Sequence, residues 1–356
     1  FESAAENYLQ ELSELLRDGR YVPIAVKRVY IPKGDGRLRP LGIPAVKDRI
    51  VQVAIKLVIE PIFEQEFLSL SYGFRPNRGA KDALREVDQC LKDGMKWVVD
   101  ADLKSFFDMI PHPHIQQQLR NRISDGRLLG VIESFLSQRI MGEMESWIPD
   151  RGTPQGAVLS PLLANVALHP LDDLMRQQGF RIVRYADDFV VLCRSEMEAQ
   201  NALEHIQQWV QKVGLELHPD KTHLGNCMEV GHGFEFLGYR FECGQRHVRK
   251  KSIRKLKDAI RQKTKRTRGD NVQRIIDDLK PTLKGWFEYF KHAHYYTFPR
   301  IDGFVRRRLR AILRKQQKKP GFGANLHDHQ RWPNRFFAEL GLFTMEEARS
   351  VASQSR

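Results

Sequence analysis

The chain has 356 residues, of which 41% are hydrophobic, and a formal net charge of +14; this length suffices for two or three structural units with a sizeable core. No apolar run reaches the roughly 20 residues that span a bilayer, and no secretory signal opens the sequence, so we expect neither a membrane partner nor secretion. The four cysteines, Cys90, Cys193, Cys227 and Cys243, form no C-x-x-C pair and no zinc-ligand spacing, which argues against a disulfide framework and favours a reducing cytoplasm.

The positive charge is concentrated in one part of the chain. Residues 246–319 contain 25 Lys and Arg against 6 Asp and Glu, a local balance of +19, which leaves −5 for the rest of the chain. A mildly acidic body joined to a strongly basic region predicts a polyanionic partner. The alternative is a solvated basic surface without a partner.

Hydrophobic periodicity and turn residues predict alternating helices and strands in the first part of the chain. In chain order the pattern predicts a helix (1–20), two strands (21–33 and within 34–44), a helix with a break near Pro61 (47–67), a loop (71–80), a helix ended by Gly94 (81–94), a strand (97–103) and two helices (112–123 and 126–140).

The second part continues this alternation and then becomes helical. It predicts a Gly-rich turn and a long helix with Ser160 as N-cap (151–179), two short strands around a tight turn (181–195), a helix ended by Gly214 (197–214), strand-like segments (215–222 and 233–242) and basic helices after about residue 250. This order argues for an α+β body with an α-helical appendage.

Three Asp-Asp dipeptides occur, and their contexts differ. The pairs at 172–173 and 277–278 lie in helical segments and are most simply polar-face residues. The pair Asp187–Asp188 lies instead in the turn of an apolar hairpin, where adjacent carboxylates repel each other unless a cation binds between them. Strand alternation puts Asp100 and Asp102 on one face of another strand. Together these acids predict a two-metal nucleotidyl-transfer site; the alternative is an ordinary polar turn.

At this point the motifs carry a resemblance to a known family. The hairpin RYADDFVVL at 184–192 contains a Tyr-x-Asp-Asp motif like that of reverse transcriptases. Six further motifs stand in the order found in group II intron-encoded reverse transcriptases, or maturases: LRPLGIPAVKDRIVQ (38–52), SYGFRPNRGAKDAL (71–84), DADLKSFFDMIPH (100–112), RGTPQGAVLSPLLANVALH (151–169), LHPDKT (217–222) and FEFLGYRF (234–241). The resemblance covers nearly the whole chain.

The resemblance implies a catalytic centre in these motifs. It implies that Asp102, Asp187 and Asp188 hold two Mg²⁺ ions, which Mn²⁺ can replace, with Asp100 as a neighbour of the triad. Phe106 resembles the family's gate against a 2′-hydroxyl, and Gln155 its contact to the incoming dNTP. The remaining implied residues are Lys33 and Arg39 as triphosphate contacts, with Arg37 an equally placed competitor, and Lys221 as the proton donor to pyrophosphate, with an ordinary surface lysine as the alternative.

The family's architecture implies a right-hand polymerase fold with fingers (1–95), palm (96–244, with fingers-associated helices at about 113–150), a basic helical thumb or maturase X domain (245–320) and a short region after the thumb (321–356) without an endonuclease domain. The implied nucleic-acid contacts are Arg75, the primer-grip residues Phe236, Gly238 and Tyr239, and Arg306, Arg307 and Arg308 in the thumb. For the primer-grip residues an ordinary core strand is the alternative. Aromatic residues between the thumb's bases can stack on unpaired nucleotides, but we expect about half of them to be helix core.

The resemblance implies a bacterial, cytoplasmic RNA-directed DNA polymerase. Its partners would be structured intron RNA or another RNA template, a DNA or RNA primer or target DNA, and dNTPs, and it would also serve as a splicing and retrohoming cofactor. Two alternatives stay open: a domesticated relative in DNA repair or CRISPR spacer acquisition, and an RNA-binding maturase whose polymerase centre is vestigial. The intact acidic triad, Phe106 and Gln155 argue against the second.

Overall fold

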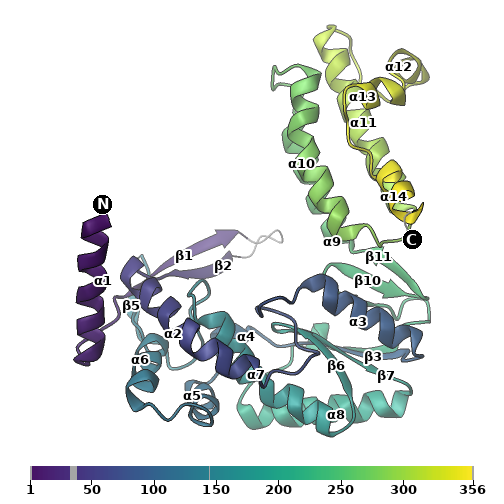
Figure 1. Cartoon of the computed structure of the whole chain (residues 1–356). Helices are drawn as coiled ribbons and strands as arrows, with labels where there is room; N and C mark the ends of the chain where they lie inside the picture. Colours follow the sequence, from purple (N-terminus) through teal and green to yellow (C-terminus); the bar gives the residue numbers. More distant parts are fainter. Residues whose placement is uncertain (1, 33–37, 144, 355–356) are drawn as a thin grey trace. The chain divides into compact units, whose positions relative to one another are not determined.

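The computed structural model describes residues 2–32, 38–143 and 145–354, and the chain divides into two compact units, residues 1–226 and residues 227–356 (Figure 1). The first unit is mixed α and β, and the second consists of a small sheet followed by helices. The expected α+β body with a helical appendage is confirmed. Among the described residues, no helix is both long and apolar enough to cross a bilayer.

A four-stranded antiparallel sheet with the order β6-β7-β3-β8 forms the centre of the first unit. Its strands are β3 (Trp97–Asp102), β6 (Arg181–Tyr185), β7 (Asp188–Cys193) and β8 (His223–Asn226). The middle of β7 is buried on both faces, because α3 (Ala80–Lys92) covers one face and α8 (Glu196–Val213) the other, with α7 (Ser160–Gln177) beside α8 (Figure 1). This double coverage explains why the strands read as apolar runs rather than strict alternation.

A second sheet lies toward the N-terminus and has the order β2-β1-β4-β5. The long hairpin of β1 (Val26–Pro32) and β2 (Leu38–Ile43) pairs with the short strands β4 (Ile140–Met141) and β5 (Ser146–Trp147). The accompanying helices are α1 (Glu2–Arg17), α2 (Val46–Glu64), α4 (Phe106–Met109), α5 (His112–Arg120) and α6 (Gly126–Leu136).

Three local expectations for the first unit are corrected. The helix α2 does not break at Pro61 but runs through it to Glu64, because a proline this close to a helix end removes only one late hydrogen bond. Ser160 is not the N-cap of α7; Leu159 takes that position, and the Ser160 hydroxyl donates to the Pro154 carbonyl at 2.8 Å. Residues 215–222 form no strand; a 3₁₀ turn, η1 (Pro219–Lys221), stands there instead.

The second unit begins with a three-stranded antiparallel sheet, β9 (Phe234–Phe236), β10 (Tyr239–Glu242) and β11 (Gln245–Val248). Six helices follow: α9 (Lys250–Lys263), α10 (Val272–Phe290), α11 (Thr297–Gln316), α12 (Leu326–Arg331), α13 (Asn334–Glu339) and α14 (Met345–Gln354). Residues 227–244, expected in the palm, belong to this unit, because Tyr239 of β10 packs its ring 5.0 Å from that of Phe290 in α10.

Candidate active site

The three predicted acids of the triad meet at one end of the central sheet. The β3–β7 register places Asp102 directly opposite Asp188, and directly opposed residues in an antiparallel pair project from the same face. Asp187 lies in the two-residue turn that joins β6 to β7, next to Asp188. The local sequence favours this arrangement, because apolar strands on each side of the turn are fixed by burial and leave the acids at the strand ends.

The environment of Asp187 disfavours a bare negative charge. Burial raises the pKa of the Asp187 carboxyl, and the nearby charge of Asp102 raises it further, while Arg39 and Arg184 oppose the shift. A bound divalent cation would favour the charged form of Asp187, because its positive charge offsets the cost of burying a carboxylate.

Lys221 lies at the same end of the sheet. The segment before it runs alongside β3: the His218 amide donates to the Asp102 carbonyl at 2.7 Å, and Leu103 forms a bridge with Leu217. The turn η1 then carries Lys221 back, so that its ammonium forms an ion pair with the Asp102 carboxylate. Lys221 is therefore beside the predicted first metal ligand, although half of its side chain is exposed.

The donor set suits a hard cation. Asp102, Asp187 and Asp188 offer carboxylate oxygens, which Mg²⁺ and Mn²⁺ prefer. In the described ranges, however, no three acidic, His or Cys side chains are already drawn together as a complete metal site. The residues fit the ions in chemistry and in register, and the carboxylates must converge when a cation binds.

Gln155 lies in the loop that precedes α7 and is held between two elements. Its side-chain amide donates to Asp108 Oδ2 at 2.9 Å, and its carbonyl accepts from the Gly42 amide of β2 at 2.7 Å. The same loop is tied to α4, since the Thr153 amide donates to the Phe107 carbonyl at 2.7 Å. The His112 ring also contacts the Gly152 carbonyl at 2.7 Å. Gln155 is thus fixed near the segment that follows Asp102.

The burial of Phe106 argues against the gate role that the sequence predicts for it. The Phe106 side chain is 2% exposed and belongs to the hydrophobic core, so it cannot stack against a sugar. Phe107, the next residue, is only partly buried and places its ring 6.3 Å from that of the exposed Phe74. The direction changes here because Ser105, just before α4, has a left-handed φ of 50° that ends the strand alternation.

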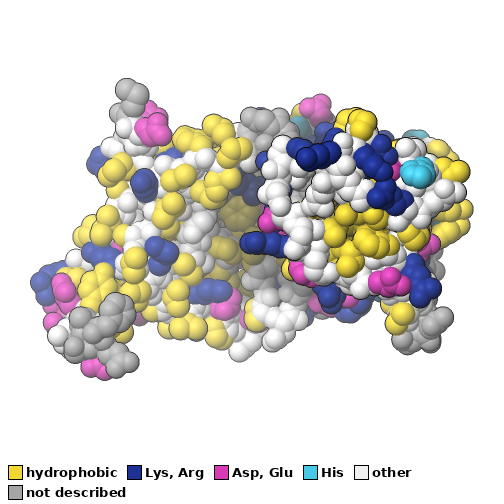
Figure 2. All heavy atoms as spheres, turned by 90° about the horizontal axis from the view of Figure 1, so that it is seen from above, with side chains coloured by type: hydrophobic (Ala, Val, Ile, Leu, Met, Phe, Trp, Pro, Cys, Tyr) yellow, Lys and Arg dark blue, Asp and Glu magenta, His cyan; other side chains and the backbone are white. Residues whose placement is uncertain are grey.

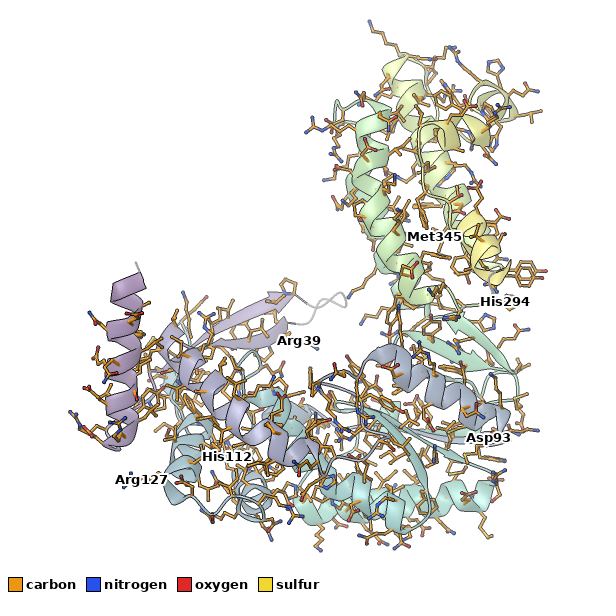
Figure 3. All side chains as sticks on the ribbon, viewed as in Figure 1. Arg39, Asp93, His112, Arg127, His294 and Met345 are labelled. Carbon is orange, nitrogen blue, oxygen red and sulfur yellow. The ribbon has the colours of Figure 1, made fainter. Side chains whose placement is uncertain are left out.

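Of the two predicted triphosphate contacts, only Arg39 can be placed. It stands exposed on β2 opposite Ile31, and its charge acts on Asp187 (Figure 3). Lys33 and its competitor Arg37 lie outside the described residues.

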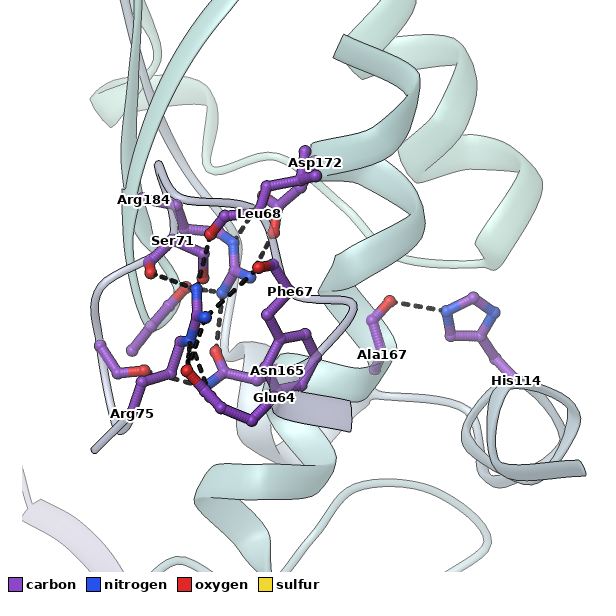
Figure 4. Close-up of polar contacts among 12 residues, drawn as sticks. Glu64, Phe67, Leu68, Ser71, Arg75, His114, Asn165, Ala167, Asp172 and Arg184 are labelled. Atoms are coloured by element: carbon purple, nitrogen blue, oxygen red, sulfur yellow. Dashed lines mark hydrogen bonds and ion pairs between the residues drawn. The ribbon is translucent and has the colours of Figure 1, made fainter. Parts of the chain in front are cut away.

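Arg75 is not a nucleic-acid contact in this structure, which corrects the expectation. Its guanidinium is buried and pairs with Glu64, with Nη2–Oε1 at 2.7 Å. The remaining donors bond the carbonyls of Phe67, Leu68 and Ser71, so all of its nitrogens have protein partners (Figure 4). Arg75 holds the 67–75 loop together.

The predicted primer-grip side chains are core residues. Phe236 is 1% exposed and Tyr239 is fully buried, with its hydroxyl donating to the Tyr289 carbonyl at 2.6 Å. Their side chains therefore cannot bind nucleic acid, which leaves the core-strand alternative. Gly238 has a φ of 85°, a conformation that favours glycine.

The arginines of α11 have different surroundings. Arg308 is corrected as a nucleic-acid contact, because its guanidinium donates to the side chain and, at 2.8 Å, to the carbonyl of Thr264 after α9. Arg307 is exposed and lies 5.6 Å over the Phe304 ring, and Arg306 is half-buried. Among the aromatic residues, Phe287, Phe290 and Phe298 are buried, whereas Tyr295 and Tyr296 are about half exposed, as expected for a mixture of core and surface.

Sequence reasoning missed a buried polar network next to the turn that carries Asp187. Asp172, expected on a polar helix face, is 1% exposed and pairs with the fully buried Arg184 (Figure 4). The signal was present: Asn165 and Asp172 are seven residues apart in α7 and so share a face with apolar neighbours, and Arg184 interrupts an apolar strand.

Two protein-family models match most of this chain. The family model described as "Reverse transcriptase (RNA-dependent DNA polymerase)" matches residues 31–241, and the model described as "Group II intron, maturase-specific domain" matches residues 253–332. Protein YkfC of Escherichia coli (strain K12) is 34% identical over 271 residues, which cover 65% of this chain and 70% of that protein.

Two further similarities concern longer proteins. The group II intron-encoded protein LtrA of Lactococcus lactis subsp. cremoris is 33% identical over 213 residues, 59% of this chain but only 35% of LtrA. The solved structure of apo telomerase from Candida tropicalis superposes with a TM-score of 0.53 at 14% identity, over 90% of this chain and 59% of that one, which supports the fold alone.

Proposed function

This chain belongs to the reverse transcriptase family and carries a group II intron maturase-specific domain, and from that premise we propose that it is an active RNA-directed DNA polymerase. It extends the 3′-hydroxyl of a primer with dNTPs on an RNA template. It also binds structured group II intron RNA and acts as a splicing and retrohoming cofactor. The observation that carries the polymerase proposal is the cross-strand pairing of Asp102 with Asp188 beside the turn residue Asp187.

In this proposal the three carboxylates hold two divalent ions, which would stabilise the attacking and leaving oxygens of an in-line displacement. Each nearby residue has its own part. Arg39 neutralises the charge of the incoming triphosphate, and Gln155 orients the nucleotide. Lys221, whose ammonium already stands beside Asp102, protonates the departing pyrophosphate.

We assign the contact with the deoxyribose to Phe107 instead of Phe106. The Phe107 ring is partly exposed, and its main-chain carbonyl accepts from the Thr153 amide, which ties the segment after Asp102 to the loop that carries Gln155. The burial of Phe106 leaves no room for that role.

The second unit supplies the RNA contact in this proposal. Lys257 and Arg261 of α9 and Arg307 of α11 gather over the ring of Phe304, each within 5.6 Å of its centroid. Arg261 also pairs with Asp258 at 2.5 Å, but three cations against one acid leave a net positive charge that favours a polyanion. Figure 2 shows Lys and Arg side chains gathered on one face of the helical unit. We propose residues 1–95 as fingers, 96–226 as palm and the basic helices as thumb.

The direct test of the polymerase proposal is primer extension by the full chain on an RNA template. We expect dNTP incorporation that follows the template sequence, requires Mg²⁺ or Mn²⁺ and stops on chelation. A folded, RNA-binding protein that extends no primer with either ion would favour the vestigial maturase instead.

The structure separates two neighbouring arginines of α11. Arg307→Gln should weaken RNA binding and flatten its log–log salt dependence by about 0.7–0.9, the value for one lost phosphate contact. Arg308→Gln should keep the slope of the wild type but lower the free energy of unfolding by about 1–3 kcal/mol, because buried acceptors at Thr264 lose their donors.

Filter binding at several salt concentrations, together with thermal unfolding, measures both effects. If Arg308→Gln changes the salt slope and Arg307→Gln does not, the assignment of these two side chains is reversed.

A further inference from the structure

A fully buried ion pair lies behind the catalytic turn. Arg184 of β6 is 0% exposed, and its Nε donates to Asp172 Oδ1 of α7 at 2.7 Å (Figure 4). A second hydrogen bond joins Arg184 Nη2 to Asp172 Oδ2, so the pair is bidentate. Removing both charges from water costs free energy that apolar packing would not cost, so the pair needs another reason to be there.

The remaining donor of this guanidinium points to that reason. Arg184 Nη1 donates to the side-chain oxygen of Asn165 at 2.9 Å and to the main-chain carbonyl of Ala186 at 3.0 Å. The Ala186 carbonyl belongs to the peptide bond that joins Ala186 to Asp187. The ion pair therefore holds the peptide group from which the proposed catalytic carboxylate projects.

That peptide needs support because its conformation is unfavourable. Ala186 has a φ of 59°, in the left-handed region that residues with a Cβ rarely adopt. A turn built from such a residue persists only when its surroundings hold it there, and Arg184 supplies one of those contacts.

A second contact supports the turn from the side of the 71–75 loop. The backbone of Gly73 lies so close to Ala186 that a Cβ on Gly73 would stand 2.2 Å from the Ala186 nitrogen. Asn165 Nδ2 donates to the Gly73 carbonyl at 2.8 Å while its Oδ1 accepts from Arg184. Asn165 thus ties the loop on one side of the turn to the guanidinium on the other.

We propose that Arg184, Asp172 and Asn165 are positioning residues that fix the 186–187 peptide and thereby aim Asp187 at the metal and nucleotide. They touch no substrate in this proposal, and they act through the turn. The inference rests on the proposed polymerase function, because it concerns how the carboxylate of that site is held.

The test uses Asn165→Ala and Asp172→Asn in the full chain, with Asp48→Asn as a matched control. Asp48 is an equally buried carboxylate of the first unit, and it bonds Tyr21, the Ile24 amide and Gln138, none of which belongs to the 186–187 turn. All variants are compared at a temperature at which circular dichroism shows them folded.

Two quantities are measured: direct Mn²⁺ binding by electron paramagnetic resonance, and the Mg²⁺ concentration at half-maximal primer extension. We expect Asn165→Ala and Asp172→Asn to bind Mn²⁺ about 10- to 100-fold more weakly than the wild type, as is typical when a partner of a metal ligand is removed. Both variants should need correspondingly more Mg²⁺ for half-maximal primer extension. The control should lose thermal stability without either change, since a purely structural role moves only the melting temperature.

Wild-type Mn²⁺ affinity in a folded Asn165→Ala variant would overturn the proposal. Asp172→Asn leaves Arg184 buried without a counter-charge and can fail to fold; Asn165→Ala keeps the ion pair and then decides the matter. Asp187→Asn separates the two hypotheses. If Asp187→Asn binds Mn²⁺ and extends primers as the wild type does, the proposed function fails. If Asp187→Asn loses Mn²⁺ binding and primer extension while Asn165→Ala keeps both, only the positioning role is overturned.

Discussion

Replacing Asp187 with Asn should abolish Mg²⁺-dependent primer extension while leaving the fold intact. The substitution keeps the shape of the side chain but removes the charge that we propose holds a cation beside Asp102 and Asp188. Metal stabilisation of charge in the transition state is worth several kcal/mol, which corresponds to a rate loss on the order of 10²- to 10⁴-fold.

The same substitution should not lower the melting temperature. Burial raises the pKa of Asp187, so the native environment opposes its charged form, and a neutral amide removes that opposition. An equal or higher melting temperature, measured without divalent ions, is therefore expected. A lower one would mean that the carboxylate serves the fold.

Asp173→Asn is the matched control for this experiment. Asp173 also belongs to an Asp-Asp dipeptide, but it is partly exposed and pairs with Arg176 one turn along α7 at 2.6 Å. Primer extension should be unchanged in this variant. Wild-type extension by Asp187→Asn, or equal losses in both variants, would contradict the assignment of the triad.

The placement of Asp102, Asp187 and Asp188 at one end of the sheet could be predicted because its signals are local. Each acid ends or joins a strand whose apolar residues fix the register, and the surrounding motifs follow the order of a known family. Gly214 was predicted to end α8 for the same reason: its φ of 82° depends on the chain next to it.

The buried network behind the triad could not be predicted in the same way. The spacing of Asn165 and Asp172 in α7 and the place of Arg184 in an apolar strand indicate burial, but they do not show that these three side chains meet. The ion pair with Arg184, which comes from another element of the fold, explains why Asp172 is buried although the sequence predicts it on a polar helix face. The Arg75–Glu64 pair is a parallel case, because a loop arginine is a nucleic-acid contact or an internal clamp depending on what folds over it.

Neighbouring residues also carry an ambiguity of orientation. The strand alternation that places Asp102 and Asp188 on one face stops at Ser105, so it cannot say which of Phe106 and Phe107 points to the core. In α11, successive residues point about 100° apart, so Arg307 and Arg308 cannot face the same partner. In both cases the packing partner decides, and it is distant in sequence.

This ambiguity leads to a paired prediction for Phe106 and Phe107. Phe106→Ala removes a core side chain and should lower the free energy of unfolding by about 3–5 kcal/mol, without changing the choice between dNTPs and rNTPs. Phe107→Ala should cost less stability, because its ring is only partly buried. It should instead let ribonucleotides compete better, by on the order of 10- to 100-fold, the range of one steric contact in a binding pocket.

Single-nucleotide incorporation with dNTP and rNTP in separate reactions, together with thermal unfolding, measures both effects in both variants. The pair serves as its own control, since the two residues differ in burial but not in type. The two rings lie 5.7 Å apart, centroid to centroid. Phe107→Ala therefore removes a neighbour of Phe106, and we expect a small loss of stability in this variant too. Selectivity that changes in Phe106→Ala and not in Phe107→Ala would mean that the core ring moves to the surface when nucleotide binds, because in the present arrangement it has no path to the sugar.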